Sequence, residues 1–334
     1  MNSVRICFVG SGISFIEQDR KLLESLGYDV DQHSYKGNLF SYLLSYSREI
    51  KRAVKDADIV FGWFASWETI PAVYYAKRYG KKSIVVTGGY DVVYMPEIKY
   101  GAFTNNKEKM SARYVLNNAD LLLPFSYHSK DEILLRSTPN NIKVVYIGVN
   151  SHKFKVKKNK QNIAITVGGV NQSNLKRKGI EYFVKAAKYL PEVPFCVIGK
   201  CSDDAVDYLA SVASDNVTFT GFVSDAELLD WYQKSKVYVQ VSAHEGFGLA
   251  MAEAMLCGNV PVITIKGAIP EVVGNAGIYV NYGDEKATAD AIKVALESSE
   301  DMRKAARRRI ENHFSLEERE NKLKDIVDTV LRER

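Results

Sequence analysis

The sequence has few cysteines, and their spacing does not suggest a shared metal or disulfide. Only four occur among 334 residues, at Cys7, Cys196, Cys201 and Cys257, and none forms a C-x-x-C pair. Structural zinc and iron–sulfur sites, and small secreted domains held by disulfides, show closely spaced cysteines. We therefore expect reduced thiols, a cytoplasmic location and no bound metal.

Long hydrophobic runs are also lacking. A membrane-spanning helix needs roughly 20 apolar residues in succession, and no segment approaches this. No basic and then apolar leader precedes the first apolar run at residues 4–9. The net charge of +5 is mild, and no RNA-binding signature accompanies the basic residues. We expect a soluble protein without a signal peptide, a spanning helix or a nucleic-acid partner.

Two basic clusters leave contact with a membrane surface open. Residues 51–55 and 77–82 each gather several lysines and arginines. Such clusters attract anionic lipid, and peripheral binding at the inner face of the membrane is one interpretation. A solvated helix face is the default alternative.

Short apolar runs alternate with amphipathic stretches along the whole chain, which is typical of β-α-β units around a parallel sheet. The expected strands are 4–9, 28–33, 58–63, 83–87, 120–123, 143–147, 162–168, 194–199, 217–220, 236–241 and 260–264. Helices are expected at 16–26, 70–79, 179–190, 225–234, 248–257 and 285–298. The lysine-rich stretch 153–160 is the predicted linker. The sequence thus predicts an α/β fold with two Rossmann-like domains, 1–152 and 153–315, and a helix at 316–334 that can cross back to the first domain.

The first strand is followed by Gly10-Ser11-Gly12, the beginning of a dinucleotide-binding pattern. Phe15 occupies the position of the required third glycine. A redox dinucleotide is therefore disfavoured. Gly10 and Gly12 instead fit a place where a ligand or the facing domain approaches the backbone closely.

The most informative segment joins a strand ending near Val241 to a helix through residues 245–248. A helix that begins after glycines offers free amide N–H groups and a positive dipole end to a phosphate. Glu245 precedes this helix and Glu253 lies two turns inside it. Carboxylates near a phosphate need another partner, and sugar hydroxyls are suitable donors to them. Taken alone, Glu245 could equally be a capping acid and Glu253 a solvated helix residue.

This segment, HEGFGLAMAEAMLCGNVPV, resembles the signature of retaining glycosyltransferases of family four, in which seven residues separate two glutamates. The resemblance covers most of residues 163–283 and, more loosely, the whole chain. It implies the B-type fold, in which two Rossmann-like domains face a cleft. It also implies retaining transfer of a hexose-type sugar from a nucleoside-diphosphate sugar to an acceptor hydroxyl, with no metal and no other cofactor.

The resemblance assigns roles to individual residues. Glu253 would bind the ribose hydroxyls and Glu245 the hydroxyls of the donor sugar. The amides around Phe247, Gly248 and Leu249 would contact the diphosphate.

A second element, residues 167–179, places glycines and a basic cluster after a strand and before a helix. Gly168 and Gly169 would admit a diphosphate, and fixed cations would neutralise the charge of the leaving group. Lys178 matches a lysine of the family pattern, whereas Gly169 stands where the family has an arginine. Lys176 or Arg177 is the candidate replacement, and a solvated basic cluster is the alternative.

The first half is predicted to bind the acceptor, whether a glycan, a lipid-linked molecule or a small molecule. Family members often carry a histidine in a loop of this half, but here the loop reads Thr87-Gly88-Gly89-Tyr90-Asp91. We predict that Asp91 orients the acceptor or donor sugar, with Tyr90, Gly10 and Gly12 on the acceptor side. A capping role is the alternative for Asp91. In the family's proposed mechanism the departing phosphate takes the acceptor's proton, so positioning matters more than a strong base.

Two acidic motifs are given less weight. The D-x-D at 56–58 lies at a helix-to-strand junction, where acids commonly mark a turn. Glu271 could line the cleft or simply begin a helix after Pro270.

Two other function classes remain compatible with this pattern. One is a nucleotide-sugar epimerase or a phosphorylase on the same scaffold. The other is a non-catalytic nucleotide-sugar-binding subunit, suggested by the missing arginine and histidine. The donor's base and sugar, the linkage and the oligomeric state are not encoded in a fixed motif.

Overall fold

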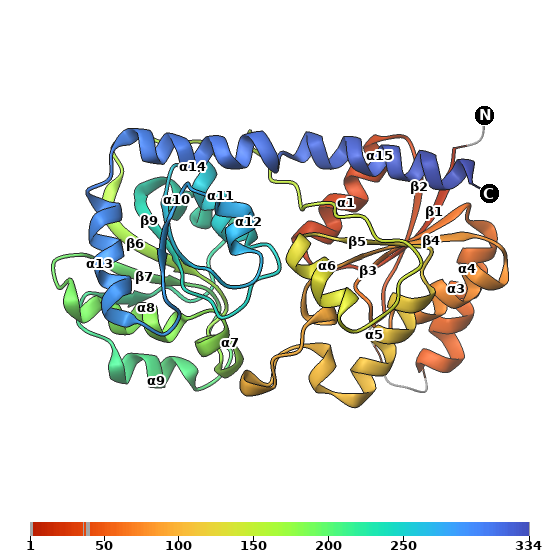
Figure 1. The fold of residues 1–334 in the computed structure, drawn as a ribbon, viewed down its shortest axis with the longest axis horizontal. Coiled ribbons are helices and arrows are strands. Elements are labelled where there is room, and N and C mark those ends of the chain that lie inside the picture. Colours follow the sequence, from red (N-terminus) through yellow and green to blue (C-terminus); the bar gives the residue numbers. More distant parts are fainter. Residues whose placement is uncertain (1–2, 36, 38–40, 334) are drawn as a thin grey trace. The chain divides into compact units, whose positions relative to one another are not determined.

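The computed structural model describes residues 3–35, 37 and 41–333, which form two compact units (Figure 1). One unit comprises Met1–Ile147 together with Glu317–Arg334, and the other comprises Gly148–Leu316. Each unit is an α/β structure built around its own parallel sheet. Within the described ranges, no helix is both long and apolar enough to cross a bilayer.

The first unit contains a five-stranded parallel sheet in the order β2-β1-β3-β4-β5. Its strands are β1 (Arg5–Val9), β2 (Asp29–His33), β3 (Ile59–Trp63), β4 (Lys82–Thr87) and β5 (Leu121–Pro124). The helices are α1 (Ser14–Ser25), α3 (Ser47–Asp56), α4 (Ile70–Arg78), α5 (Asn106–Asn118), α6 (Tyr127–Leu134) and α15 (Leu316–Arg332), with a π-helical turn at Tyr42–Tyr46 and 3₁₀ turns at Tyr90–Val92, Pro96–Ile98 and Ala102–Thr104.

The sequence pattern of this unit follows from burial. Strands β1, β3 and β4 read as continuous apolar runs because helices cover both faces of a parallel sheet. Asp58 of the D-x-D accepts a hydrogen bond from the amide of Arg5 at 2.8 Å, so it joins the starts of β1 and β3. The motif therefore has a structural role.

The strand predicted at 143–147 is wrong. Ile142 forms only an isolated parallel bridge with Leu122, and the amide of Val145 donates to the carbonyl of Pro124. The segment thus lies beside β5 without forming a ladder. Its apolar residues Val145 and Ile147 are nevertheless buried, which explains the misleading pattern.

The second unit contains a six-stranded parallel sheet in the order β11-β10-β9-β6-β7-β8. Its strands are β6 (Gln161–Val167), β7 (Phe195–Ile198), β8 (Val217–Phe219), β9 (Ser235–Gln240), β10 (Val260–Thr264) and β11 (Ile278–Val280). The helices are α7 (Gln172–Arg177), α8 (Ile180–Ala186), α9 (Ala205–Val212), α10 (Asp225–Lys234), α11 (Leu249–Leu256), α12 (Ile269–Val273), α13 (Glu285–Leu296) and α14 (Glu300–His313), with a 3₁₀ turn at Ala187–Tyr189.

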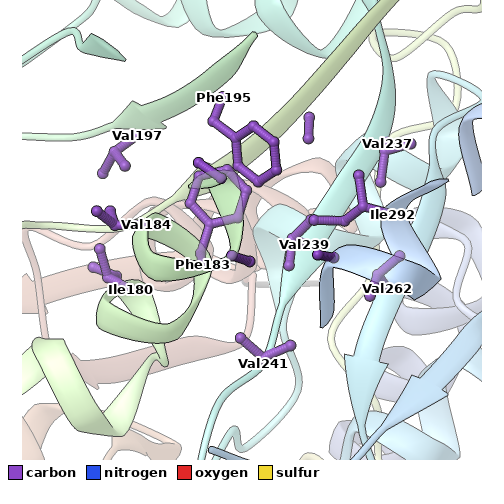
Figure 2. Packing of buried hydrophobic residues seen from close by; sticks show 14 of the residues in the cluster. Ile180, Phe183, Val184, Phe195, Val197, Val237, Val239, Val241, Val262 and Ile292 are labelled. Atoms are coloured by element: carbon purple, nitrogen blue, oxygen red, sulfur yellow. The ribbon is translucent and has the colours of Figure 1, made fainter. Parts of the chain in front are cut away.

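The core of this unit lies between its sheet and helices α8 and α13. Figure 2 shows Phe183 of α8 packed against Phe195 of β7, with ring centroids 5.0 Å apart, and Ile292 of α13 near Val239 of β9. Strands β6 and β9 are neighbours in the sheet and run parallel. The loops that follow them therefore meet at one edge, the usual ligand-binding edge of such a sheet.

The stretch 153–160 is not a free linker. The boundary between the units falls between Ile147 and Gly148, and Phe154 is buried. Lys160 donates to the carbonyl oxygens of Tyr232 at 2.9 Å and Ser235 at 2.6 Å. Lysine side chains can cover apolar surface with their methylenes while the amine finds a polar partner, so a charged segment can still pack on a domain.

Helix α15 packs on the first unit (Figure 1), where Arg319 and Glu320 contact Asp19 and Ser25 of α1. Leu323, Ile326, Val327 and Val330 are its buried apolar face. Arg319 forms a two-pronged ion pair with Asp19 of α1, with both N–O distances 2.5 Å, and both side chains are almost fully buried. The guanidinium also donates to the carbonyls of Val145 and Tyr146.

Candidate active site

Glu245 is the centre of a buried polar cluster at the carboxyl ends of β6 and β9. Its Oε1 accepts hydrogen bonds from Gln240 Nε2 at 2.6 Å, Lys178 Nζ at 3.0 Å and Ser242 Oγ at 3.3 Å. The residue is only 9% exposed. Burial by itself would raise the pKa of Glu245, but the charges of Lys178 and Arg177 hold it below its usual value. Glu245 is therefore an ionised carboxylate at neutral pH.

Lys178 reaches Glu245 because Gly168 has no side chain. A Cβ at position 168 would lie 2.7 Å from Cδ of Lys178. Gly168 therefore makes room for a protein cation, and not only for a ligand. Gly169 is less constrained, since its nearest neighbour would lie 3.7 Å from such a Cβ.

The basic cluster lies directly before α8, as the sequence predicted, and it also closes a short helix, α7, that was not predicted. Asn171 caps α7 by accepting from the amide of Asn174, and Lys178 follows the last turn. Cations suit the negative end of a helix dipole, which accounts for this placement. Gly179, with φ of +68°, then begins α8.

Lys176 and Arg177 were the two candidates to replace the family arginine that is missing at position 169. Of these two, Arg177 lies next to Glu245. Its NH1 is 3.9 Å from Oε1 of Glu245. Its Nε and NH2 donate to Oδ1 of Asn174, which fixes the guanidinium plane. The structure brings Arg177 and Lys178 together at this carboxylate.

The predicted phosphate-facing turn precedes α11. Gly248 has φ of +88°, a conformation that favours glycine, and the helix begins at Leu249. Phe247 is buried against Phe314, with ring centroids 5.5 Å apart, and this packing anchors the turn. The first amides of α11 have no partner within the helix, as at any helix start.

Glu253 is the fifth residue of α11, about one turn inside the helix, and is half-buried. Its Oε2 accepts a hydrogen bond from the hydroxyl of Tyr232 at 3.2 Å. Burial raises the pKa of Glu253 to about 7, against the opposing effect of Tyr232. Its protonation state therefore changes near neutral pH.

Three partners of the two glutamates were not predicted. Gln240 and Ser242 interrupt an otherwise apolar run at the end of β9, and this break in pattern was the available signal. Tyr232 belongs to α10, and nothing in its sequence context links it to Glu253.

The first unit has its own pocket of about 420 Å³ near the carboxyl ends of β1 and β3. Its lining includes the predicted residues Gly10, Tyr90 and Asp91, whereas Gly12 is not among the described lining residues. Four further aromatic side chains line the pocket: Tyr35, Trp63, Phe64 and Trp67. Two further carboxylates, Glu68 and Glu108, also belong to its lining.

Asp91 is a positioning residue for the floor of this pocket. Its Oδ2 accepts from the amide of Ala65 at 2.9 Å, and its Oδ1 accepts from the amides of Gly88 at 3.3 Å and Gly89 at 2.9 Å. The side chain thus joins the loops after β3 and β4. A direct contact between Asp91 and a sugar stays a prediction.

Asp91→Asn should destabilise the first unit by about 2 kcal/mol, because the new NH₂ group would face a backbone N–H in a buried site. Burial raises the pKa of Asp91 from 3.8 to about 6. Since the folded pKa is the higher one, the carboxyl group stabilises the fold most below about pH 4, and this contribution declines as the pH rises to about 6. The difference in unfolding free energy between wild type and variant should therefore shrink over that range.

Urea denaturation at several pH values measures this difference. Asp56→Asn, at an exposed position at the end of α3, is the matched control and should change little. A destabilisation by Asp91→Asn that does not vary between pH 4 and 6 would contradict the assignment.

Comparison with known proteins places this geometry in context. Residues 161–298 match the family model described as Glycosyl transferases group 1. The matched segment contains Lys178, Glu245 and Glu253. The match agrees with the resemblance to glycosyltransferases that the sequence shows over residues 163–283.

One curated relative is the O-antigen chain mannosyltransferase RfbU of Salmonella typhimurium. It is 33% identical over 182 residues, which cover 52% of this chain and 50% of RfbU. The chain spans about half the length of the leading curated relatives that it matches.

Solved structures establish the fold over nearly the whole chain. Sucrose-phosphate synthase from Thermosynechococcus elongatus superposes with a TM-score of 0.82 at 17% identity, covering 99% of this chain and 100% of that one. Anabaena HepE, crystallised with UDP and glucose, gives a TM-score of 0.78 at 16% identity, covering 98% and 100%. The predicted fold class is confirmed: the protein has two parallel-sheet α/β domains of the B-type glycosyltransferase fold.

Proposed function

We propose that this protein is a retaining glycosyltransferase that moves a hexose from a nucleoside-diphosphate sugar to a hydroxyl of a carbohydrate or lipid-linked acceptor. The observation that carries the proposal is the ionised Glu245 held between Lys178 and Arg177 beside the start of α11. The family match over residues 161–298 supports the same assignment.

The donor would lie along this cluster. Within the described residues no hydrogen bond reaches Oε2 of Glu245, so this oxygen is available to hydroxyls of the donor sugar. Glu253 would accept from the ribose hydroxyls, and the amides at the start of α11 would bind the diphosphate.

Charge stabilisation would come from the protein itself. As the bond from the sugar to the diphosphate breaks, negative charge grows on the leaving phosphate. Lys178 and Arg177 are fixed cations at this cluster and can neutralise that charge. We therefore propose that transfer does not require a metal ion or another cofactor.

Retention of configuration would follow if the acceptor attacks from the face that the phosphate leaves. The leaving phosphate oxygen then takes the proton of the acceptor hydroxyl, so no strong protein base is needed. The aromatic pocket of the first unit suits the acceptor, because sugar C–H faces pack on aromatic rings while carboxylates such as Glu108 accept hydrogen bonds from hydroxyls.

Because the relative RfbU is named a mannosyltransferase, mannose is the first donor sugar to test. The UDP and glucose bound by HepE support a nucleotide-sugar donor of this kind. We further propose action in the cytoplasm, with peripheral contact at the inner face of the membrane when the acceptor is lipid-linked. A panel of UDP-, GDP- and ADP-sugars, scored by the rise in melting temperature, identifies the donor.

Donor binding should weaken as the pH falls below about 7, where Glu253 becomes protonated and loses an acceptor oxygen. The dissociation constant should rise toward about tenfold per pH unit. Calorimetry from pH 5.5 to 8, roughly one unit or more on each side of that pKa, measures this. Glu253→Gln should bind more weakly at pH 8 and show a flat profile, whereas Glu297→Gln, at an exposed position after α13, should match wild type.

Two results would count against the proposal. One is donor affinity that is unchanged in Glu253→Gln at every pH. The other is release of nucleoside diphosphate at the same rate with and without acceptor, since transfer couples release to the acceptor.

A further inference from the structure

A second concentration of positive charge lies in the second unit, at the opposite edge of its sheet. A pocket of about 670 Å³ is lined by residues that precede or begin β6, β9 and β10, and by one face of α14. These are the amino ends of the strands, whereas the glutamate cluster lies at their carboxyl ends. Since β6 has seven residues, the two sites are separated by roughly 20 Å of sheet.

Five lysines and two arginines line this pocket with a single acid, Glu300. Three of the cations are paired: Lys157 with Asp230, Lys304 with Glu300, and Arg307 with Glu311. Among the described residues, Lys158, Lys236 and Arg303 form no ion pair with a carboxylate, so positive charge is left uncompensated.

Lys160 adds a half-buried cation whose position is fixed. Its amine donates to the carbonyls of Tyr232 and Ser235, and its side chain passes Gly258, where an added Cβ would lie 3.5 Å from Cε. Burial, together with the charge of Arg303, lowers the pKa of Lys160 to about 7. The attraction of a bound anion would oppose this lowering of the pKa and favour the charged amine.

We propose that this basic pocket, lined by Lys160, Lys236, Arg303 and their neighbours, binds a phosphate-bearing anion independently of the donor. The concave shape and the mixture of lysine with arginine suit a phosphate group, since several donors can converge on its oxygens. The phosphate belongs either to a free phosphorylated metabolite or to the headgroup of an anionic lipid. In the second case the pocket would hold the second unit against a membrane.

The double variant Lys236→Gln/Arg303→Gln tests the site, because within the described residues neither side chain forms a hydrogen bond or ion pair that the substitution would remove. Calorimetry with inorganic phosphate should show a dissociation constant raised about 30-fold, from two lost cations near the ligand. Lys107→Gln/Lys109→Gln on α5 removes the same charge elsewhere and should change phosphate binding less than about twofold. Nucleotide-sugar binding should be unchanged in both variants.

Co-sedimentation with phosphatidylcholine vesicles, with and without phosphatidylglycerol, separates the two sources. Loss of both phosphate and vesicle binding in the double variant supports a lipid headgroup, and loss of phosphate binding alone supports a free phosphate. If the double variant does not fold, Lys158→Gln, at an exposed position, should still weaken phosphate binding. Equal phosphate binding by wild type and the pocket variants, or none by wild type, would overturn the proposal.

Discussion

Lys178→Met is expected to lower kcat/KM for sugar transfer by about 10²–10³-fold, the effect of removing one preorganised group that stabilises developing charge. The Lys178 amine lies 3.0 Å from Glu245 at the proposed diphosphate site. The variant would remove a cation from the leaving phosphate and would also free Glu245 to move. Initial rates of transfer from the donor identified by the panel, at saturating acceptor, give the ratio.

Two controls show whether the effect is specific to Lys178. Lys188→Met removes an exposed lysine that pairs with Glu285 in the same unit, and it should leave the rate within about twofold. Thermal unfolding of both variants shows whether the fold survives. Full transfer activity in a folded Lys178→Met protein would refute the role assigned to this residue.

Arg319→Met should destabilise the first unit by about 3–5 kcal/mol, the usual effect of removing one partner of a buried ion pair. Asp19 has no solvent exposure, and without Arg319 its carboxylate would be buried and uncompensated. The carbonyls of Val145 and Tyr146 would lose their donor as well. This loss is a large part of the stability of a typical domain.

Tryptophan fluorescence can follow the first unit separately. Trp63 lies 5.7 Å from the Arg319 guanidinium, so it reports on this region, and a Trp231→Phe background removes the tryptophan of the second unit. Asp19→Leu/Arg319→Met, which replaces both charges by apolar groups, should recover much of the loss. Lys322→Met, at a partly exposed position on the same helix, should change stability by less than about 0.5 kcal/mol. Equal stability of wild type and Arg319→Met would contradict the argument.

Much of the fold could be predicted because buried parallel strands are continuous apolar runs. The predicted 58–63 and 236–241 lie within a residue of β3 and β9. Two short elements were not predicted. Helix α7 has six residues and strand β11 has three, and such lengths are too short to show a helical or strand period of apolar residues. The lysine-rich stretch 153–160 was predicted to be a linker because it is highly charged. The contacts of Lys160 with backbone carbonyls, which hold this stretch on the second unit, cannot be inferred from its charge.

The candidate site was predictable where a motif carries the chemistry. The spacing of Glu245 and Glu253 and the position of Lys178 were visible in the sequence. The partners Gln240 and Tyr232 were not, because contacts between elements depend on how strands and helices pack. Asp91 was singled out for its charge, whereas its burial among three backbone amides appears only in the folded loop.

The position of helix α15 has a consequence for synthesis of the chain. The strands of the first sheet are synthesised early, but Arg319, the ion-pair partner of Asp19, is translated 300 residues after it. Until then the carboxylate of Asp19 and the apolar surface that Val327 later covers remain exposed to solvent. We therefore expect the first unit to complete its folding only after the second unit has been synthesised, and to expose apolar surface that chaperones can bind until then.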